Sequence, residues 1–103
     1  MIIGIAKHQE FIASRFDCAE EFLIIELQNS QITKQFILQC LDKNLLRKAL
    51  LMFQSSVNII ICGSIDSFSL RLLEDHKITV ISGQHGQLQD VLDRWLKQLG
   101  GGS

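Results

Sequence analysis

Three short runs of almost entirely apolar residues constrain the fold of this chain most strongly. They span residues 2–6, 57–62 and 78–81. Apolar runs of this length, without regular polar alternation, are typical of strands that are buried on both faces of a parallel sheet. Helical periodicity precedes the second run and separates it from the third, so helices connect these strands. The pattern predicts an α/β fold with helices on both faces of the sheet.

A hairpin is predicted between the first and second runs. Residues 22–27 and 32–38 are rich in β-formers, and Asn29 in their short connection can adopt the positive φ of a tight turn. Lys34 interrupts the apolar face of the second segment, as expected near a sheet edge. With this hairpin, the predicted sheet is mixed and has five strands.

Three helices are expected. Asp42 is predicted to cap the first helix, over residues 43–54, with Leu41 and Leu46 placed for a hydrophobic staple. The second helix follows residues 63–67, and the third ends the domain. The apolar residues at helical spacing, expected to face inward, are Leu45, Leu46, Ala49, Leu50 and Phe53, then Phe68, Leu72 and Leu73, and finally Leu88, Val91, Leu92, Trp95, Leu96 and Leu99.

The predicted core combines positions from these strands and helices. Truncating any large core residue to alanine is expected to lower the free energy of unfolding by about 2–5 kcal/mol. The predicted core residues are Ile3, Ile5, Ile24, Leu46, Leu50, Ile59, Ile61, Leu72, Val80, Leu92 and Trp95.

The size and charge of the chain limit what it can bind. Its 103 residues, of which 47% are hydrophobic, are enough for one domain over residues 1–99, and residues 100–103 are interpreted as a flexible tail or linker. The net charge of -1 gives no electrostatic reason to expect a nucleic acid or an anionic membrane as partner. No apolar run approaches the roughly 20 residues that are needed to cross a bilayer.

The three cysteines, Cys18, Cys40 and Cys62, lie far apart in the sequence. Their odd number and wide spacing do not indicate a disulfide framework, a zinc knuckle or a redox motif. Unpaired thiols favour a reducing compartment, so a cytoplasmic location is expected.

Motifs for catalysis are missing. A nuclease with two metal ions needs clustered carboxylates that begin on the first strand, but residues 1–6 contain no acid. The chain also contains no P-loop, no GxGxxG fingerprint and no Gly-x-Ser-x-Gly elbow. The sequence therefore predicts a protein that is not an enzyme.

The order of these segments resembles a known family. The second half of the chain resembles the dinitrogenase iron-molybdenum cofactor biosynthesis family in residues 57–65, the helix ending in Leu72-Leu73, residues 78–80 and the final amphipathic helix. The first half resembles that family's first strand in residues 1–6, and its loop and second strand in residues 14–27. The resemblance implies a ribonuclease H-like three-layer α/β/α fold with strand order 3-2-1-4-5, in which strand 2 is antiparallel. It also implies binding of an iron-sulfur, iron-molybdenum-sulfur or molybdenum-copper-sulfur cluster, partners that assemble or receive cofactors, and a monomer or weak homodimer.

Two positions depart from the family pattern. Arg15-Phe16-Asp17 stands where the family usually has His-Phe-Gly, so a histidine and a glycine are missing from the first loop. Lys77 stands where the family commonly has the glycine that ends the second helix. Glycine adopts a positive φ more easily than lysine does, so we expect the helix to end in a different way here.

The implied strand order places a ligand site between strands 1 and 4, at the carboxyl ends where strand order reverses. Cys18 follows strand 1 and Cys62 ends strand 4, so these thiols are candidate metal ligands for one cluster. Gly63 admits a close ligand, and Gly63 and Ser64 are candidates to offer backbone N–H groups to an anionic cluster. His85, in a glycine-flanked loop, is a further candidate cofactor-binding residue or a plain turn residue.

Packing explains some of these residues equally well. Cys62 is either a ligand or a small core residue, and Cys40 is interpreted as a packing residue at the same edge. His8 emerges at that edge too, whereas His76 is expected to complement a helix dipole at the opposite edge. The sequence leaves two functional hypotheses: a non-catalytic carrier of a metal-sulfur cluster, and a cluster-free protein-protein interaction module.

Overall fold

A mixed β-sheet with the order β4-β3-β1-β5-β6 runs through the middle of the computed structural model, which describes residues 1–99. Its strands are β1 (Ile2–His8), β3 (Glu21–Gln28), β4 (Gln31–Gln39), β5 (Ile59–Ile61) and β6 (Thr79–Ile81). β1, β5 and β6 are parallel, and β3 is antiparallel to both of its neighbours. This confirms the predicted order and the antiparallel second strand. A two-residue strand, β2 (Phe11–Ile12), pairs with the end of β1 and was not predicted.

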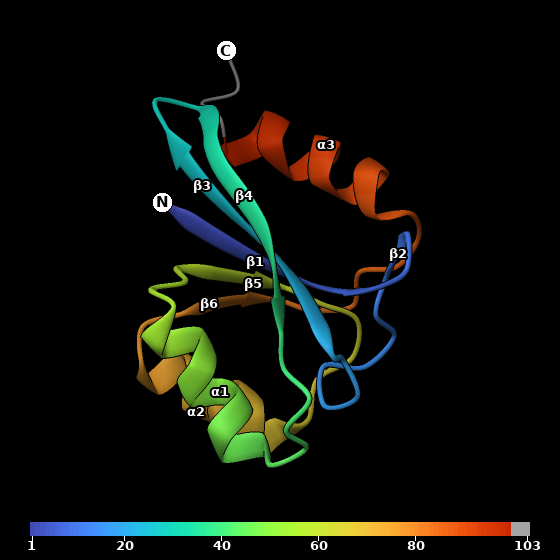
Figure 1. Ribbon diagram of the computed structural model, residues 1–103, viewed down its shortest axis with the longest axis vertical. Helices are drawn as coiled ribbons and strands as arrows, with labels where there is room; N and C mark the ends of the chain where they lie inside the picture. Colours follow the sequence, from blue (N-terminus) through green and yellow to red (C-terminus); the bar gives the residue numbers. More distant parts are fainter. Residues whose placement is uncertain (100–103) are drawn as a thin grey trace.

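Helices cover both faces of the sheet, as predicted. α1 (Leu45–Gln54) and α2 (Ser67–Asp75) lie on one face, and α3 (Leu88–Leu99) lies on the other (Figure 1). One core packs Ile24 and Ile60 beneath α1 and α2, and the other packs Ile3, Ile5 and Ile61 beneath α3. Because successive residues of a strand point to opposite faces, the central strands need apolar residues at every position. The ribonuclease H-like classification stays a prediction.

The start of α1 differs from the prediction. Asn44, not Asp42, caps the helix by accepting a hydrogen bond from the backbone N of Arg47, while Asp42 accepts one from the backbone N of Asn44. Leu46 is 45% exposed, so the prediction that it belongs to the core is wrong. Leu41 is exposed as well, so the hydrophobic staple between these two residues does not form. The cap begins the helix two residues later than predicted. Ala49 is buried as predicted, and the other buried residues of the helix are Lys48 and Met52, which were not expected to face inward.

The other predicted core residues are mostly confirmed. Six of them are buried, namely Ile3, Ile5, Ile24, Ile59, Ile61 and Leu92. Four are partly buried, namely Leu50, Leu72, Val80 and Trp95. Phe53 and Phe68, which were expected to face inward, are half exposed. The side chain of Leu99 and the predicted tail at residues 100–103 lie outside the described residues.

Left-handed backbone at Asn29 and Lys77 bears on two of the predictions. Asn29 adopts a φ of 53° in the β3–β4 hairpin, as predicted. Lys77 itself adopts a φ of 66° after α2, so the expected change to a different helix ending is wrong. Lysine takes the conformation that glycine adopts more easily, at the cost of a contact between its Cβ and the backbone. His76 closes α2, and its ring Nδ1 lies 2.8 Å from the Leu72 carbonyl oxygen, in keeping with its predicted place at the helix end.

Within residues 1–99, the longest helix has too few apolar residues to cross a membrane.

Candidate functional site

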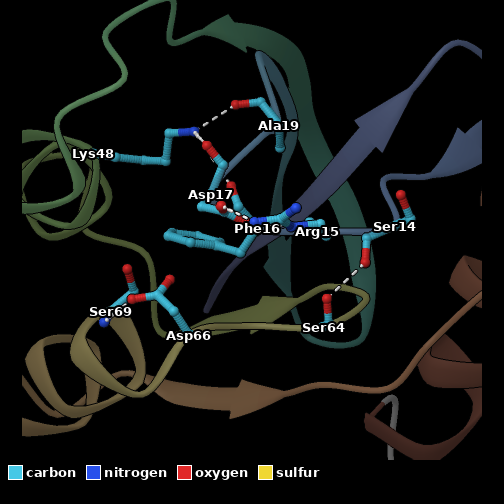
Figure 2. Close-up of polar contacts among 9 residues, drawn as sticks. All are labelled: Ser14, Arg15, Phe16, Asp17, Ala19, Lys48, Ser64, Asp66 and Ser69. Carbon is cyan, nitrogen blue, oxygen red and sulfur yellow. Dashed lines mark hydrogen bonds and ion pairs between the residues drawn. The ribbon is translucent and has the colours of Figure 1, made fainter.

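The loop after β2 closes the edge of the sheet between β1 and β5. Arg15 and Ser64 form a parallel bridge, in which the backbone N of Phe16 donates to the Ser64 carbonyl at 2.8 Å. The backbone N and the Oγ of Ser64 both donate to the Ser14 carbonyl, at 2.8 and 3.1 Å (Figure 2). The chain's own backbone therefore fills the place where the sequence predicted a ligand.

Gly63 is needed for this closure. A Cβ atom at Gly63 would lie 2.4 Å from the Ser14 carbonyl oxygen and 2.6 Å from that of Ala13, closer than real Cβ atoms approach such atoms. The predicted close approach at Gly63 is therefore made by the protein's own loop. The backbone N–H of Ser64 is already bound to Ser14, so the expectation that it is offered to an anionic cluster is wrong.

Cys62 lies in the core, not at the surface of this edge. Its side chain is fully buried under α1 and α2, and burial raises the pKa of its thiol to about 11. Since the thiolate is the form that binds metals, a neutral buried thiol is a poor ligand at neutral pH. Cys62 lines neither of the two cavities described below, so the structure does not bring it together with Cys18.

His85 is not among the residues that line the two cavities beside Cys18. It is exposed in the loop before α3. The same loop contacts β2 through its backbone, because the Gly86 carbonyl accepts a hydrogen bond from the backbone N of Ile12 at 3.0 Å. Whether His85 is a cofactor-binding residue or a plain turn residue stays a prediction.

A cavity of about 660 Å³ opens at the carboxyl end of β1. It is bounded by the ends of β1 and β4, the start of β3, β2 and the loop that follows β2. Among the lining residues, those that carry charge or a metal-binding atom are Lys7, His8, Arg15, Cys18, Glu20 and Glu21. A second cavity of about 340 Å³ shares Cys18 and Glu20 and adds Cys40 and Lys48. The accessible thiol of Cys18 thus faces both cavities.

Acidic partners balance the cations of the larger cavity. The Lys7 ammonium lies 3.2 Å from Glu21, and the Arg15 guanidinium donates two hydrogen bonds to Asp17, at 2.6 and 3.1 Å. The hydrogen bond from Arg15 holds the pKa of the Asp17 carboxyl below its usual value. The soft and borderline donors that remain are the Cys18 thiol and the exposed imidazole of His8.

These donors limit the kind of metal that fits. Across the described residues, no group of three or more His, Cys, Asp or Glu side chains is placed to hold a single metal ion. Iron-sulfur clusters are held mainly by cysteine thiolates, with histidine at some sites, so Cys18 and His8 are donors of a suitable kind.

Lys48 holds the loop that carries Cys18. The side chain is 2% exposed, and its ammonium donates to the carbonyl oxygens of Asp17 and Ala19 at 2.8 Å and to that of Phe16 at 3.3 Å (Figure 2). It also lies 5.8 Å from the centre of the Phe16 ring. These carbonyls come from both sides of Cys18, so α1 fixes the backbone at this thiol.

The importance of Lys48 was not predicted from the sequence. A signal for it exists, because Lys48 lies three residues after Leu45 and four before Met52, inside the apolar stripe of α1. A lysine at such a position must either reach solvent or find buried acceptors. Here three loop carbonyls are those acceptors.

Solved structures with the same fold have very different sequences. The crystal structure of PH0822 superposes with a TM-score of 0.88 at 12% identity, covering 95% of this chain and 90% of that one. MJ0327 of Methanocaldococcus jannaschii gives 0.78 at 15% identity, covering 95% and 89%. The apo form of the orange protein from Desulfovibrio gigas gives 0.78 at 13% identity, covering 94% and 88%. These likenesses establish a shared fold.

No curated protein matches the sequence significantly. The family model described as "Dinitrogenase iron-molybdenum cofactor" matches residues 1–98, which is nearly the whole chain. The protein therefore belongs to the dinitrogenase iron-molybdenum cofactor family.

Proposed function

We propose that this protein is a non-catalytic carrier in cofactor biosynthesis. Its cargo is an iron-sulfur or molybdenum-containing metal-sulfur cluster, which it passes to an assembly or recipient protein. Family membership supports the role, and the observation that carries it is the 660 Å³ cavity into which the accessible Cys18 thiol opens. The three free cysteines favour work in a reducing cytoplasm.

Two of the lining residues supply the protein's donors in this proposal. Cys18 binds a metal atom of the cluster as thiolate, and His8 is the second donor from the protein. Lys7 and Arg15 line the same cavity, but each is paired with an acidic side chain, Glu21 and Asp17, so the cargo is held by the two donors and not by excess positive charge. Two protein donors leave most metal positions to the cluster's own ligands, which suits a carrier that must release its cargo.

Reconstitution without oxygen tests this function. The full chain is incubated with ferrous iron, molybdate and sulfide, desalted, and measured by visible absorption and metal analysis. A carrier is expected to retain colour and a fixed ratio of metal to protein, because thiolate-bound clusters absorb visible light. A colourless, metal-free protein would favour the second candidate, a cluster-free protein-protein interaction module.

The second candidate also has an observation in its favour. Arg15 and Asp17, which replace the family's usual histidine and glycine, bind each other. The loop therefore satisfies its own charges without a ligand. A module of this kind would bind partner proteins in the same way whether or not metal and sulfide were present.

A cysteine variant locates the cluster on the protein. The Cys18→Ser variant is expected to lose most of the retained iron and molybdenum, because a hydroxyl is a far poorer ligand for these metals than a thiolate. Cys62→Ala is the matched control: it removes a buried thiol and is expected to keep the metal content, while the free energy of unfolding falls by about 1 kcal/mol. Equal metal content in the Cys18→Ser and native proteins would place the cluster elsewhere.

A further inference from the structure

β4 is a long edge strand with few of the features that normally protect an edge. It is nine residues long and ends the sheet, with β3 as its only neighbour in the sheet order (Figure 1). Ile32, Phe36 and Ile37 are each 42–45% exposed, and Lys34 is the only charged residue in the strand. Edge strands in monomers are usually shortened, charged or covered, because their free backbone groups can pair with another strand. This exposed edge therefore resembles an unoccupied interface.

The backbone of β4 offers a regular set of free groups. The backbone N of Cys40 donates to the Glu20 carbonyl at 2.8 Å, in the same register that pairs Gln39 with Glu21. In an antiparallel ladder, every second residue of a strand bonds to a given neighbour through its backbone. Because Cys40 bonds to β3, the even-numbered residues of β4 face β3, and the N–H and C=O groups of Gln35, Ile37 and Gln39 point away from it. They are available to a strand that adds to this edge.

The side chains of β4 complement those of a second copy in antiparallel orientation. Around Gln35, a two-fold axis places Lys34 opposite Phe36 of the second copy, and Thr33 opposite its Ile37. Within one chain the Lys34 ammonium already lies 5.4 Å from the centre of the Phe36 ring, so a cation–π contact fits these side chains. No like charges face each other directly in this register.

We propose that β4 pairs with β4 of a second copy, forming a symmetric dimer with one continuous sheet centred on Gln35. The regular pairing covers residues 33–37, because the irregularity opposite Glu26 and Leu27 interrupts the ladder next to Thr33. A two-fold interface closes on itself, so assembly stops at the dimer. In this arrangement Gln39, which lines the larger cavity, lies near the β3–β4 turn of the second copy.

A charge swap at the axis tests the dimer. In the Gln35→Lys variant, and equally in Gln35→Glu, two like charges face each other, which is expected to weaken self-association by about five-fold. Mixing the two variants places opposite charges on the axis, and a mixed dimer is expected to exceed both self-dimers in native mass spectrometry. Gln31→Lys, away from the axis, is the control and is expected to dimerise like the native chain.

A proline substitution tests the backbone contact. Gln35→Pro removes an outward N–H from each copy without removing a bond to β3, and an edge strand tolerates such a proline. It is expected to abolish the dimer in sedimentation equilibrium while the circular dichroism spectrum is unchanged. A native chain that stays monomeric from micromolar to millimolar concentration would overturn the proposal, as would open-ended polymers. A native dimer whose Gln35→Lys and Gln35→Glu variants do not prefer each other would also overturn it.

Discussion

The Lys48→Met variant is expected to unfold with a free energy about 3 kcal/mol lower than that of the native protein. Methionine keeps most of the volume of the side chain but donates no hydrogen bond. The carbonyls of Phe16, Asp17 and Ala19 then lose their shared donor in a place where water has little access. A buried acceptor without a partner costs free energy because its hydration was lost on folding.

Urea unfolding followed by fluorescence of the single tryptophan measures this effect. Lys43→Met is the matched control: this lysine is exposed just before α1, and its loss is expected to change the free energy of unfolding by less than about 0.5 kcal/mol. Equal stabilities of Lys48→Met and Lys43→Met would contradict the role of Lys48 in holding the loop.

Gly63→Ala is expected to lower the free energy of unfolding by about 3 kcal/mol or more. The new methyl group would overlap the backbone carbonyls of Ala13 and Ser14, which cannot rotate away as a side chain would. The Ser14 carbonyl is also held by two hydrogen bonds from Ser64. Relief requires the loop to lift from β5, which breaks the bridge between Arg15 and Ser64.

Gly4→Ala is the control for this prediction. Its Cβ would lie 3.1 Å from the Cδ1 atom of Ile60, the end of a flexible side chain, so a small rotation relieves the contact at a cost of about 1 kcal/mol. Thermal unfolding of both variants gives the comparison. If Gly63→Ala were as stable as Gly4→Ala, the loop would be loosely seated and the edge between β1 and β5 would be open to a ligand.

The fold was predictable because its pattern is local and repeated. Uninterrupted apolar runs mark β1, β5 and β6, and regular helical spacing marks α3. The errors arise where neighbouring residues compete for the same role. Asp42 and Asn44 are both good caps, and the chain uses Asn44, so α1 begins two residues later than predicted. Leu46 was misplaced because α1 turns Lys48, Ala49 and Met52 toward the core.

The site was less predictable because it depends on a contact between distant segments. The order of the strands led to the prediction that Cys18 and Cys62 meet at one edge, but nothing local shows that the loop after β2 packs onto Gly63 or that Cys62 is buried. A glycine after a buried strand admits a ligand and a chain segment equally well. The cavity beside Cys18 likewise forms only when β2, β3 and β4 come together.

Alkylation footprinting of the three thiols tests the central claim, that the cargo binds at Cys18 and not at Cys62. The native chain is treated with iodoacetamide before and after anaerobic reconstitution with iron, molybdate and sulfide, and each cysteine is quantified by mass spectrometry. We expect Cys18 to react readily in the empty protein and to be protected once metal is bound, while buried Cys62 stays unmodified throughout. A loaded protein in which Cys18 reacts as fast as in the empty protein would contradict the claim.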